Sequence, residues 1–374
     1  MMEQTKQQEA EKQQVEGVAA LNIQQDSTDD ASIMPPSKEQ QPAAEEAPQH
    51  GAVAVSARRS LTLDLELRPV KEADTAEQLL PLLEQLSTVG DVPPQFFKVR
   101  QEAVLQDENT IMVVIEDLRA KKLVGCGTIL VEPKFIHAGG FVAHLEDLVI
   151  ERGLRSKGLG SWIVNSLMKV AEERGCYKML VDCSEENVPF YKKNNFKHKG
   201  TCMTLYFPET AASGQLRHIQ VAPEDFRDEF VVRQLHIDDI KKGYLELLAQ
   251  LTVVGNVPAD VCARRIAQAE RNNCFFIVIE HKEKGQIVGA GTLLVEQKFI
   301  RSAGFAGHLE DVVVDAAIRG KGLGTKIISY LTELARKVGC YKCILDCDDH
   351  NVPFYEYCGY SKGHSPAFMA KYFE

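Results

Sequence analysis

Two stretches of the sequence combine carboxylates, an apolar run and a basic turn in the same order. "LEDLVIERGLRSKGLG" begins at Leu145, and "LEDVVVDAAIRGKGLG" begins at Leu309. Each glycine-rich turn leads into a helix pattern, and the first N–H groups of a helix have no intrahelical partner. The helix dipole also favours negative charge at this end. The turn therefore predicts a cradle for a pyrophosphate, and the carboxylates predict a reactive site at the other end of the strand.

The turn "RGKGLG" at 319–324 carries the residue types that a phosphate requires. Its glycines let a ligand approach the backbone closely, and Arg319 and Lys321 add positive charge. The glycine spacing matches neither a P-loop nor a dinucleotide fingerprint, and a plain turn is the alternative interpretation of this segment alone. A ligand with a pyrophosphate at one end and a reactive group at the other fits the whole stretch. Coenzyme A has that shape, and its pantetheine amides can pair with a strand edge.

A constant offset shows that the chain is duplicated. Glu146 and Glu310, like Tyr191 and Tyr355, are 164 residues apart. This period far exceeds the roughly 20–50 residues of solenoid repeats, so it indicates a repeated domain. Residues 1–60 are rich in Gln, Glu, Ala and Pro and predict a disordered tail. We expect a first domain at 61–208, a linker at 209–228 and a second domain at 229–374.

Both copies predict the same α/β order of elements. A strand (65–70 or 230–235) precedes a helix (77–86 or 243–251) and two strands (111–116 and 123–133, or 275–280 and 287–297). The fourth strand (145–150 or 309–314) leads through the glycine turn into a long helix, which in the second copy ends at Gly339. A fifth strand (342–347), a short helix (352–358) and a last strand (368–373) follow. This order predicts a mixed central sheet flanked by helices, with a right-handed parallel crossover.

Longer motifs resemble the GCN5-related N-acetyltransferase (GNAT) superfamily and, within it, the glucosamine 6-phosphate N-acetyltransferases. They include "LTVVG" (251–255), "VEQKFIRSAG" (295–304), "GHLEDVVV" (307–314) and "CYKCILDCDDHNVPFYEYCGY" (340–360). The first copy carries matching strings, and the resemblance covers nearly all of both copies. It implies two tandem acyl-CoA N-acyltransferase domains that use acetyl-CoA and no metal. The implied reaction acetylates D-glucosamine 6-phosphate by direct attack in a ternary complex, in UDP-N-acetylglucosamine biosynthesis.

The resemblance also implies roles for residues of both copies. The implied catalytic residues are Tyr355 and Asp346, with Tyr191 and Asp182 in the first copy. The implied acetyl-CoA contacts are Val312, Val313, Val314, Arg319, Gly320, Lys321, Gly322, Leu323, Gly324, Thr325 and Asn351, with Val149, Arg155, Lys157, Gly158, Leu159 and Gly160 in the first copy. The implied substrate contacts are Glu310, Asp311, Thr252, Lys298, Arg301, Tyr341, Lys342 and Lys371, with Glu146, Asp147, Lys134, His137, Tyr177 and Lys178 in the first copy.

The residues suit direct acyl transfer, which needs a neutral amine, a held thioester and a proton for the departing thiolate. A tyrosine with an ordinary pKa of about 10 keeps its proton at neutral pH and can donate it to sulfur. Tyr355 and Tyr191 fit this role, and a core aromatic is the alternative interpretation. A backbone N–H of the fourth strand can hold the thioester oxygen. Because neighbours on a strand face opposite sides, we expect only one of Glu310 and Asp311 to enter the site directly.

Three features depart from the family pattern. Ser156 stands where the cradle usually has glycine, and a Cβ there crowds the pyrophosphate or forces an unfavourable φ. The first copy also has "NNF" at 194–196 where the second has "CGY", so the second copy is the stronger candidate for activity. The family's last strand carries an arginine that reaches the phosphate in the partner's site, whereas here Tyr206 and Tyr372 occupy that position. Because the family forms homodimers with shared sites, we hypothesise an intramolecular pseudodimer or a homodimer.

Composition narrows the class of protein. The net charge is −10, and half of this excess lies in residues 1–60, which argues against nucleic-acid binding by the rest. No apolar run reaches the roughly 18–20 residues of a membrane span. The first residues lack a secretory pattern, so we expect a cytoplasmic protein with reduced cysteines. Cys340, Cys343 and Cys347 suggest zinc, but Cys343 and Cys347 belong to a predicted strand and no second ligand pair lies nearby.

Two alternatives stay open beside acetylation of glucosamine 6-phosphate. The missing arginine also fits a GNAT acetyltransferase for another small amine. Ser156 also fits a first copy that binds acetyl-CoA without turnover.

Overall fold

The computed structural model describes residues 58–59, 64–207, 216–217, 219–271 and 273–373. The predicted tail, apart from 58–59, lies outside these residues, as do 209–215 and 218 of the predicted linker. In the described part of the chain, no helix has the length and apolar character needed to cross a membrane.

The first copy contains every element that its sequence predicts. Its elements are β1 (Arg58–Arg59), β2 (Asp64–Pro69), α2 (Ala76–Leu83), α3 (Pro94–Gln106), β3 (Thr110–Asp117), β4 (Lys122–Pro133), β5 (Phe141–Ile150), η1 (Arg152–Leu154), α4 (Leu159–Glu173), β6 (Cys176–Cys183), η2 (Glu185–Asn187), α5 (Val188–Lys193) and β7 (Lys197–Tyr206). The sequence did not predict α3. This helix turns Arg100 and Gln101 inward, so its apolar periodicity is broken.

The second copy repeats this order. Its elements are β8 (Glu224–Phe226), β9 (Phe230–Gln234), η3 (Ile237–Lys242), α6 (Tyr244–Leu248), α7 (Ala259–Arg271), β10 (Cys274–His281), β11 (Gln286–Gln297), α8 (Ile300–Ala303), β12 (Phe305–Val314), η4 (Ala316–Ile318), α9 (Leu323–Val338), β13 (Cys340–Cys347), η5 (Asp349–Asn351), α10 (Val352–Tyr357) and β14 (Ser361–Tyr372). The sequence missed α7 as it missed α3, because Arg265 lies on the buried side of α7.

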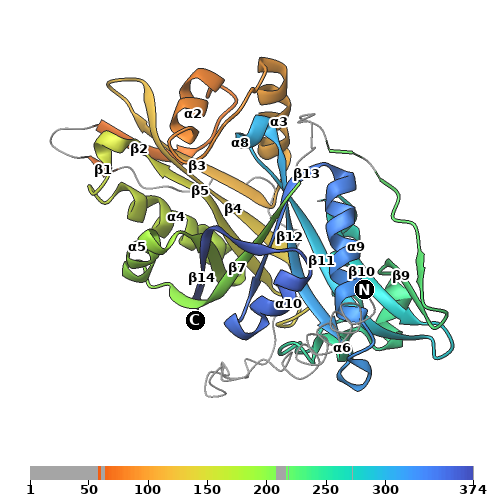
Figure 1. Cartoon of the computed structure of the whole chain (residues 1–374). Helices are drawn as coiled ribbons and strands as arrows, with labels where there is room; N and C mark the ends of the chain where they lie inside the picture. The colour runs from red at the N-terminus through yellow and green to blue at the C-terminus, as the bar shows by residue number, and fades with distance from the viewer. Residues whose placement is uncertain (1–57, 60–63, 208–215, 218, 272, 374) are drawn as a thin grey trace, which may run out of the picture.

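All described strands form one sheet, and the two copies exchange their last strands. The order is β1-β2-β3-β4-β5-β6-β14-β7-β13-β12-β11-β10-β9-β8 (Figure 1). β7 of the first copy pairs with β13 of the second, and β14 of the second pairs with β6 of the first. β7 and β14 also pair with each other. Neither copy can therefore complete its own sheet without the other.

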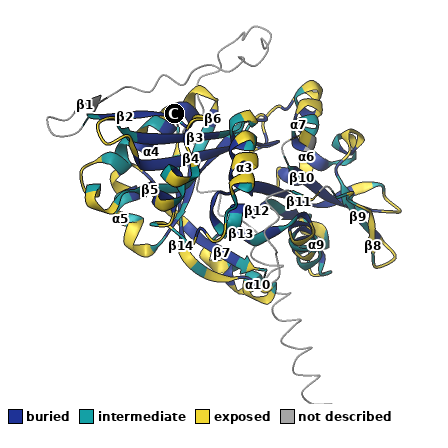
Figure 2. Ribbon diagram, turned by 90° about the horizontal axis from the view of Figure 1, so that it is seen from above, coloured by how far each residue is buried: buried dark blue, intermediate teal, exposed yellow. Residues whose placement is uncertain are grey.

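Helices cover the sheet and bury its apolar strands, as Figure 2 shows by the dark strands under yellow helix faces. The predicted stripe of α9 is confirmed, since Leu323, Ile327, Leu331 and Ala335 are all buried. α4 buries the equivalent face in the first copy. Cys340, Cys343 and Cys347 are buried in the core under α9.

Segments of each copy also pack into the core of the other copy. Phe135, just after β4, lies edge-on against Tyr244 and Phe276, with ring centroids 5.2 and 4.9 Å away. Phe299, just after β11, lies 5.2 Å from Phe97 of the first copy. The loops that follow β4 and β11 therefore cross between the copies.

Candidate active site

In each copy two parallel strands separate after a short paired stretch. β12 and β13 pair only from Phe305 to His308, and β5 and β6 pair only from Phe141 to His144. Beyond these points each strand has an unpaired edge. The other edge of β12 has a bulge, because Asp311 and Val312 have no partners in the register with β11. Asp311 adopts a φ of 52° there, and Asp147 adopts 50° in the first copy. A bulge of this kind re-aims backbone groups and side chains.

The cleft of the second copy is a cavity of about 220 Å³ to which both copies contribute. Second-copy residues come from β12, β13 and α10, and first-copy residues come from the loop after β4 and the start of β6. The lining residues are Ile136, His137, Tyr177, Lys178, Leu180, Leu251, Thr252, Leu309, Glu310, Asp311, Val312, Asp346, Cys347, Asp348, Asn351, Tyr355, Phe368 and Tyr372. The prediction that only one of Glu310 and Asp311 enters the site is wrong, because the bulge breaks the alternation of the strand.

The two predicted catalytic tyrosines lie in different surroundings. Tyr355 lines the cavity and is partly exposed, and its ring lies 5.1 Å from Phe354 and 6.5 Å from Tyr360. Tyr191 is only 7% exposed, because Phe190 and Phe196 pack edge-on against its ring at 5.0 and 5.6 Å. Burial raises the pKa of both hydroxyls, so both keep their protons at neutral pH. Only Tyr355 lines the cavity.

Each pair of carboxylates is held by a lysine from the other copy. Lys134 Nζ lies 3.0 Å from Glu310, 3.2 Å from Asp311 and 2.6 Å from Glu132. In the first copy, Lys298 Nζ lies 2.6 Å from Glu146, 3.3 Å from Asp147 and 2.5 Å from Glu296. Both lysines are buried. This corrects the prediction that they face the substrate phosphate within their own copy. They cross because the loops after β4 and β11 pack into the opposite core.

The lysines divide each carboxylate pair into two different acids. Burial alone would raise the pKa of Glu310, but Lys134 and His144 outweigh burial and lower it to about 2. Burial raises the pKa of Asp311 to about 6, although Lys134 opposes the shift. Glu146 and Asp147 show the same two values in the first copy. Glu310 is therefore ionised throughout the physiological pH range. Asp311 gains and loses a proton near pH 6, just below that range.

Other residues predicted to bind substrate also lie beside the carboxylates of the opposite copy. His137 stacks on Tyr177 with ring centroids 4.1 Å apart, and both line the cavity of the second copy. Their equivalents, Arg301 and Tyr341, do not line that cavity. The Arg301 guanidinium lies 6.0 Å from the Tyr341 ring centroid, and the charges of Asp147 and Glu146 act on Tyr341 and Lys342, respectively. These second-copy residues therefore belong on the side of the first copy's carboxylates.

Two polar side chains on the cavity wall, Lys178 and Tyr177, lack an ion-pair or hydrogen-bond partner among the described residues. The Lys178 ammonium lies 5.7 Å from the Tyr177 ring centroid, and within the described residues it forms no ion pair with a carboxylate. Burial, followed by the charge of Lys134, lowers the pKa of Lys178. The hydroxyl of Tyr177 is buried without a hydrogen-bond partner among the described residues. A cation and a hydroxyl in this state are suited to an anion. Predicted Lys371 does not line the cavity, whereas the unpredicted Tyr372 does.

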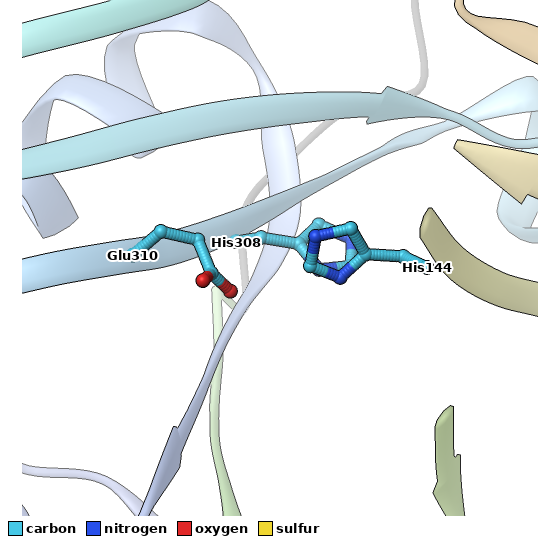
Figure 3. Close-up of side chains that lie close together, drawn as sticks. All are labelled: His144, His308 and Glu310. Atoms are coloured by element: carbon cyan, nitrogen blue, oxygen red, sulfur yellow. The ribbon is translucent and has the colours of Figure 1, made fainter. Parts of the chain in front are cut away.

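The two clefts meet in a buried polar centre. Oxygen atoms of Asp182 and Asp346 and the Sγ of Cys202 lie within 4.8 Å of one another. Burial and the nearby Asp182 raise the pKa of Asp346 well above its ordinary value. Figure 3 shows His144 and His308 with their rings together beside Glu310, and the ring centroids are 5.3 Å apart. The sequence had assigned Asp182 and Asp346 to separate sites.

Hydrogen bonds join this centre to both pairs of carboxylates. His144 Nε2 lies 2.9 Å from Glu132, and His308 Nε2 lies 3.0 Å from Glu296. The same two glutamates hold Lys134 and Lys298. Each histidine is therefore linked to one lysine network, and the two networks come together at the ring contact between His144 and His308.

The two glycine turns differ at one position, Ser156 against Gly320, and the helices that follow them differ at their start. Gly320 and Gly322 have φ values of 81° and 75°, whereas Ser156 must adopt 63° at the position of Gly320. The predicted unfavourable φ of Ser156 is therefore present. On the first turn of the helix, Lys326 in the second copy is replaced by Trp162, which packs on the first core. The sequence offset would have shown this exchange. Arg155 and Arg319 donate to the carbonyls of Ile150 and Val314, at 3.1 and 3.2 Å, and so hold the turns.

Comparisons with known proteins agree with this geometry. The Acetyltransferase (GNAT) family matches residues 77–196 and 245–360. Glucosamine 6-phosphate N-acetyltransferase of Arabidopsis thaliana is 43% identical over 149 residues, which cover 39% of this chain and 99% of that protein. Glucosamine 6-phosphate N-acetyltransferase 1 of Dictyostelium discoideum is 40% identical over 136 residues, which cover 36% of this chain and 87% of that protein.

One solved structure extends the likeness over both copies. It is described as a GCN5-related glucosamine N-acetyltransferase region in a fungal multi-domain GH3 β-N-acetylglucosaminidase. It is 12% identical, with a TM-score of 0.51, and covers 83% of this chain and 38% of that chain. At this identity the likeness concerns the fold alone.

Proposed function

This chain belongs to the acetyltransferase (GNAT) family, and we propose that it transfers acetyl from acetyl-CoA to the amine of D-glucosamine 6-phosphate. The products are N-acetyl-D-glucosamine 6-phosphate and CoA, and the reaction serves UDP-N-acetylglucosamine biosynthesis. One observation carries the proposal: a single cavity is lined by the carboxylates Glu310 and Asp311 and also by a cation, Lys178, which forms no ion pair with a carboxylate among the described residues. An amino-sugar phosphate has the complementary charges.

Acetyl-CoA fits the second copy, where a strand edge and a glycine turn follow one another. The diphosphate binds at Gly320 to Thr325, where the first N–H groups of α9 and the dipole favour an anion. Pantetheine pairs with the edge of β12 that leaves β13 after His308. Val312 to Val314 and Asn351 complete the contacts. The acetyl group then lies at the bulge, beside Tyr355.

Two sets of side chains on the cavity wall orient the sugar, one binding its amine and the other its phosphate. Glu310 and Asp311 attract the ammonium form of the amine, and Thr252 and Asp346 line the same space. Lys178, Tyr177 and His137 bind the 6-phosphate from the first copy and replace the arginine that the last strand lacks. Arg301 and Lys298 have no part in this cavity.

The reaction proceeds by direct attack in a ternary complex. The ammonium loses its proton first, and Asp311, with a pKa of about 6, is the best-matched acceptor on the cavity wall. The amine nitrogen then forms a bond to the thioester carbon, and an N–H at the bulge stabilises the oxyanion by about 2.7–4 kcal/mol. The carbon–sulfur bond breaks, and Tyr355 gives its proton to the thiolate. The nitrogen, which carries one proton too many for an amide, then returns a proton to the tyrosinate, so that Tyr355 is regenerated.

The first copy has a different task in this proposal. Tyr191 is more buried than Tyr355, Ser156 has a positive φ, and Trp162 replaces a lysine beside the cradle. We propose that the first copy turns over slowly or not at all and completes the cavity of the second. The domain boundaries 61–208 and 229–374 remain part of this proposal.

The test is thiol release from acetyl-CoA by the full chain with D-glucosamine 6-phosphate or unphosphorylated glucosamine as acceptor. We expect a kcat/KM at least about tenfold higher for the phosphorylated sugar, because a charge-assisted contact is lost without the phosphate. Equal values for the two sugars would favour another small amine as substrate. No thiol release with either sugar would favour acetyl-CoA binding without turnover.

A further inference from the structure

Part of the predicted linker lies against the second glycine cradle. We call the described residues 219–229 the strap. Tyr330 Oη on α9 donates to the carbonyl of Ala222 at 2.9 Å, and β8 pairs with β9. Between these strands the chain turns through Arg227, which has a φ of 47°. The strap therefore follows α9 and ends beside the start of that helix.

The strap borders the turn that holds phosphate in the proposed function. A Cβ built on Gly322 would lie 3.5 Å from Arg227 Nη2 and 4.0 Å from the Phe226 ring. Lys326, on the first turn of α9, forms an ion pair with Glu224 of the strap. Lys321 of the turn lies 3.5 Å from Glu229. These contacts place the Arg227 guanidinium over the cradle.

Arg227 is the strap cation whose charge is not matched. Glu224 and Glu229 each have a lysine, and Asp225 has Lys282 at 2.7 Å. Arg227 lies over the Phe226 ring at 5.3 Å, and no carboxylate in the described ranges forms an ion pair with it. A guanidinium is a planar fork that binds phosphate oxygens in pairs. A groove of about 790 Å³ runs between the strap and α9 and ends at Glu224 and Lys326, next to the cradle; Arg227 is not among its lining residues.

We propose that Arg227 is an additional cofactor-binding residue of the second copy, donating hydrogen bonds to the phosphates of acetyl-CoA at the Gly320–Gly324 turn. This inference rests on the proposed function. The first copy has no counterpart in the described residues, since nothing there comes within 4 Å of a Cβ built on Gly158. Within the part of the chain that the structure describes, Arg227 therefore borders the second cradle only.

The experiment compares the full chain with Arg227→Ala, Arg227→Lys and a matched control, Lys282→Ala. Lys282 neutralises the same strap but pairs with Asp225, away from the cradle. Binding of CoA and of pantetheine, which has no phosphate, is measured by titration calorimetry. We expect Arg227→Ala to weaken CoA binding at one class of site about tenfold, with a smaller loss for Arg227→Lys. Pantetheine binding and the control should stay within about twofold, because neither involves the contact between Arg227 and phosphate.

The outcomes separate this inference from the proposed function. CoA binding that is unchanged or tighter in Arg227→Ala overturns the role of Arg227, and tighter binding would mean that the strap obstructs the cradle. Equal losses for CoA and pantetheine also overturn it, because the effect would not depend on phosphate. Failure of the unmodified chain to bind CoA would instead refute the proposed function.

Discussion

The two copies have similar side-chain contacts at their interface and different side chains around the proposed ligand-binding sites. The lysine networks at their interface are nearly identical, with Lys134 and Lys298 each held by three carboxylates. The tyrosines proposed as proton donors and the two glycine turns differ more, since Tyr191 is buried and Ser156 has a positive φ. The exchange of β7 and β14 explains this pattern. Both copies must keep the interface to complete one sheet, whereas the proposed reaction requires only one cavity.

The largest expected effect concerns the two lysine networks, which are similar in the two copies. Lys134→Met or Lys298→Met leaves three buried carboxylates without their cation, and each change should lower the free energy of unfolding by about 3–5 kcal/mol. Denaturant unfolding measures both losses. They should be similar, but only Lys134→Met should also lower kcat/KM, because Lys134 holds Glu310 and Asp311. An equal loss of activity in Lys298→Met would show that the first cleft also works.

The next largest effect concerns the two equivalent tyrosines, Tyr355 and Tyr191, which differ in exposure. Tyr355→Phe removes the proposed proton donor and should lower kcat about 100-fold, at the lower end of general acid catalysis. Tyr191→Phe is the matched control and should change kcat by less than about twofold, since its hydroxyl does not line the cavity. Steady-state kinetics with saturating acetyl-CoA measures both. Similar losses in the two variants would contradict a single working cleft.

Most helices and strands could be predicted from the sequence, because each depends on the spacing of apolar residues within its own segment. The stripe of α9 and the short β-branched strands have clear periods, and these elements lie where expected. The offset between copies also identified equivalent residues, such as Tyr191 and Tyr355. It could not show which cleft each residue faces. Lys134 and His137 belong to the first copy in sequence, but the loop that carries them packs into the core of the second copy.

Two further features depend on pairing that sequence does not display. The bulge at Asp311 and Val312 is a register shift against β11, so alternation failed for Glu310 and Asp311. The strap was predicted as linker because its composition is mixed and polar. Its relation to Gly322 depends on how the hairpin of β8 and β9 folds back.

The third prediction sharpens the assignment of the phosphate end. Lys178→Met should raise KM for glucosamine 6-phosphate about tenfold, because it removes the unpaired cation of the cavity. Lys342→Met is the equivalent change in the other copy and should leave KM within about twofold. Neither change should affect KM for unphosphorylated glucosamine. A larger effect of Lys342→Met would move the phosphate site to the first cleft.

The same lysine predicts a pH dependence. Burial lowers the pKa of Lys178, so it loses its charge at a lower pH than an ordinary lysine. The charged form binds phosphate, so kcat/KM for glucosamine 6-phosphate should fall as pH rises through that lowered pKa. Comparing the pH profiles of the original chain and Lys178→Met measures this. The fall should be absent from the variant, and a profile with the same fall in both proteins would assign the titration to another group.

The smallest effect tests the difference between the cradles by a reciprocal exchange. Ser156 has a φ of 63°, and an L-residue in this conformation costs roughly 1–2 kcal/mol, whereas glycine costs about 0.5–1 kcal/mol in chain entropy. Ser156→Gly should therefore stabilise the protein by about 0.5–1 kcal/mol, and Gly320→Ser should destabilise it by a similar amount. Denaturant unfolding measures both. Because a Cβ at Gly320 has no heavy atom within 4 Å, strain and not a clash decides the outcome. Gly320→Ser should also weaken CoA binding, since the Cβ would stand beside the bound phosphate. Stability changes of the same sign in both variants would mean that conformational strain does not distinguish the two turns.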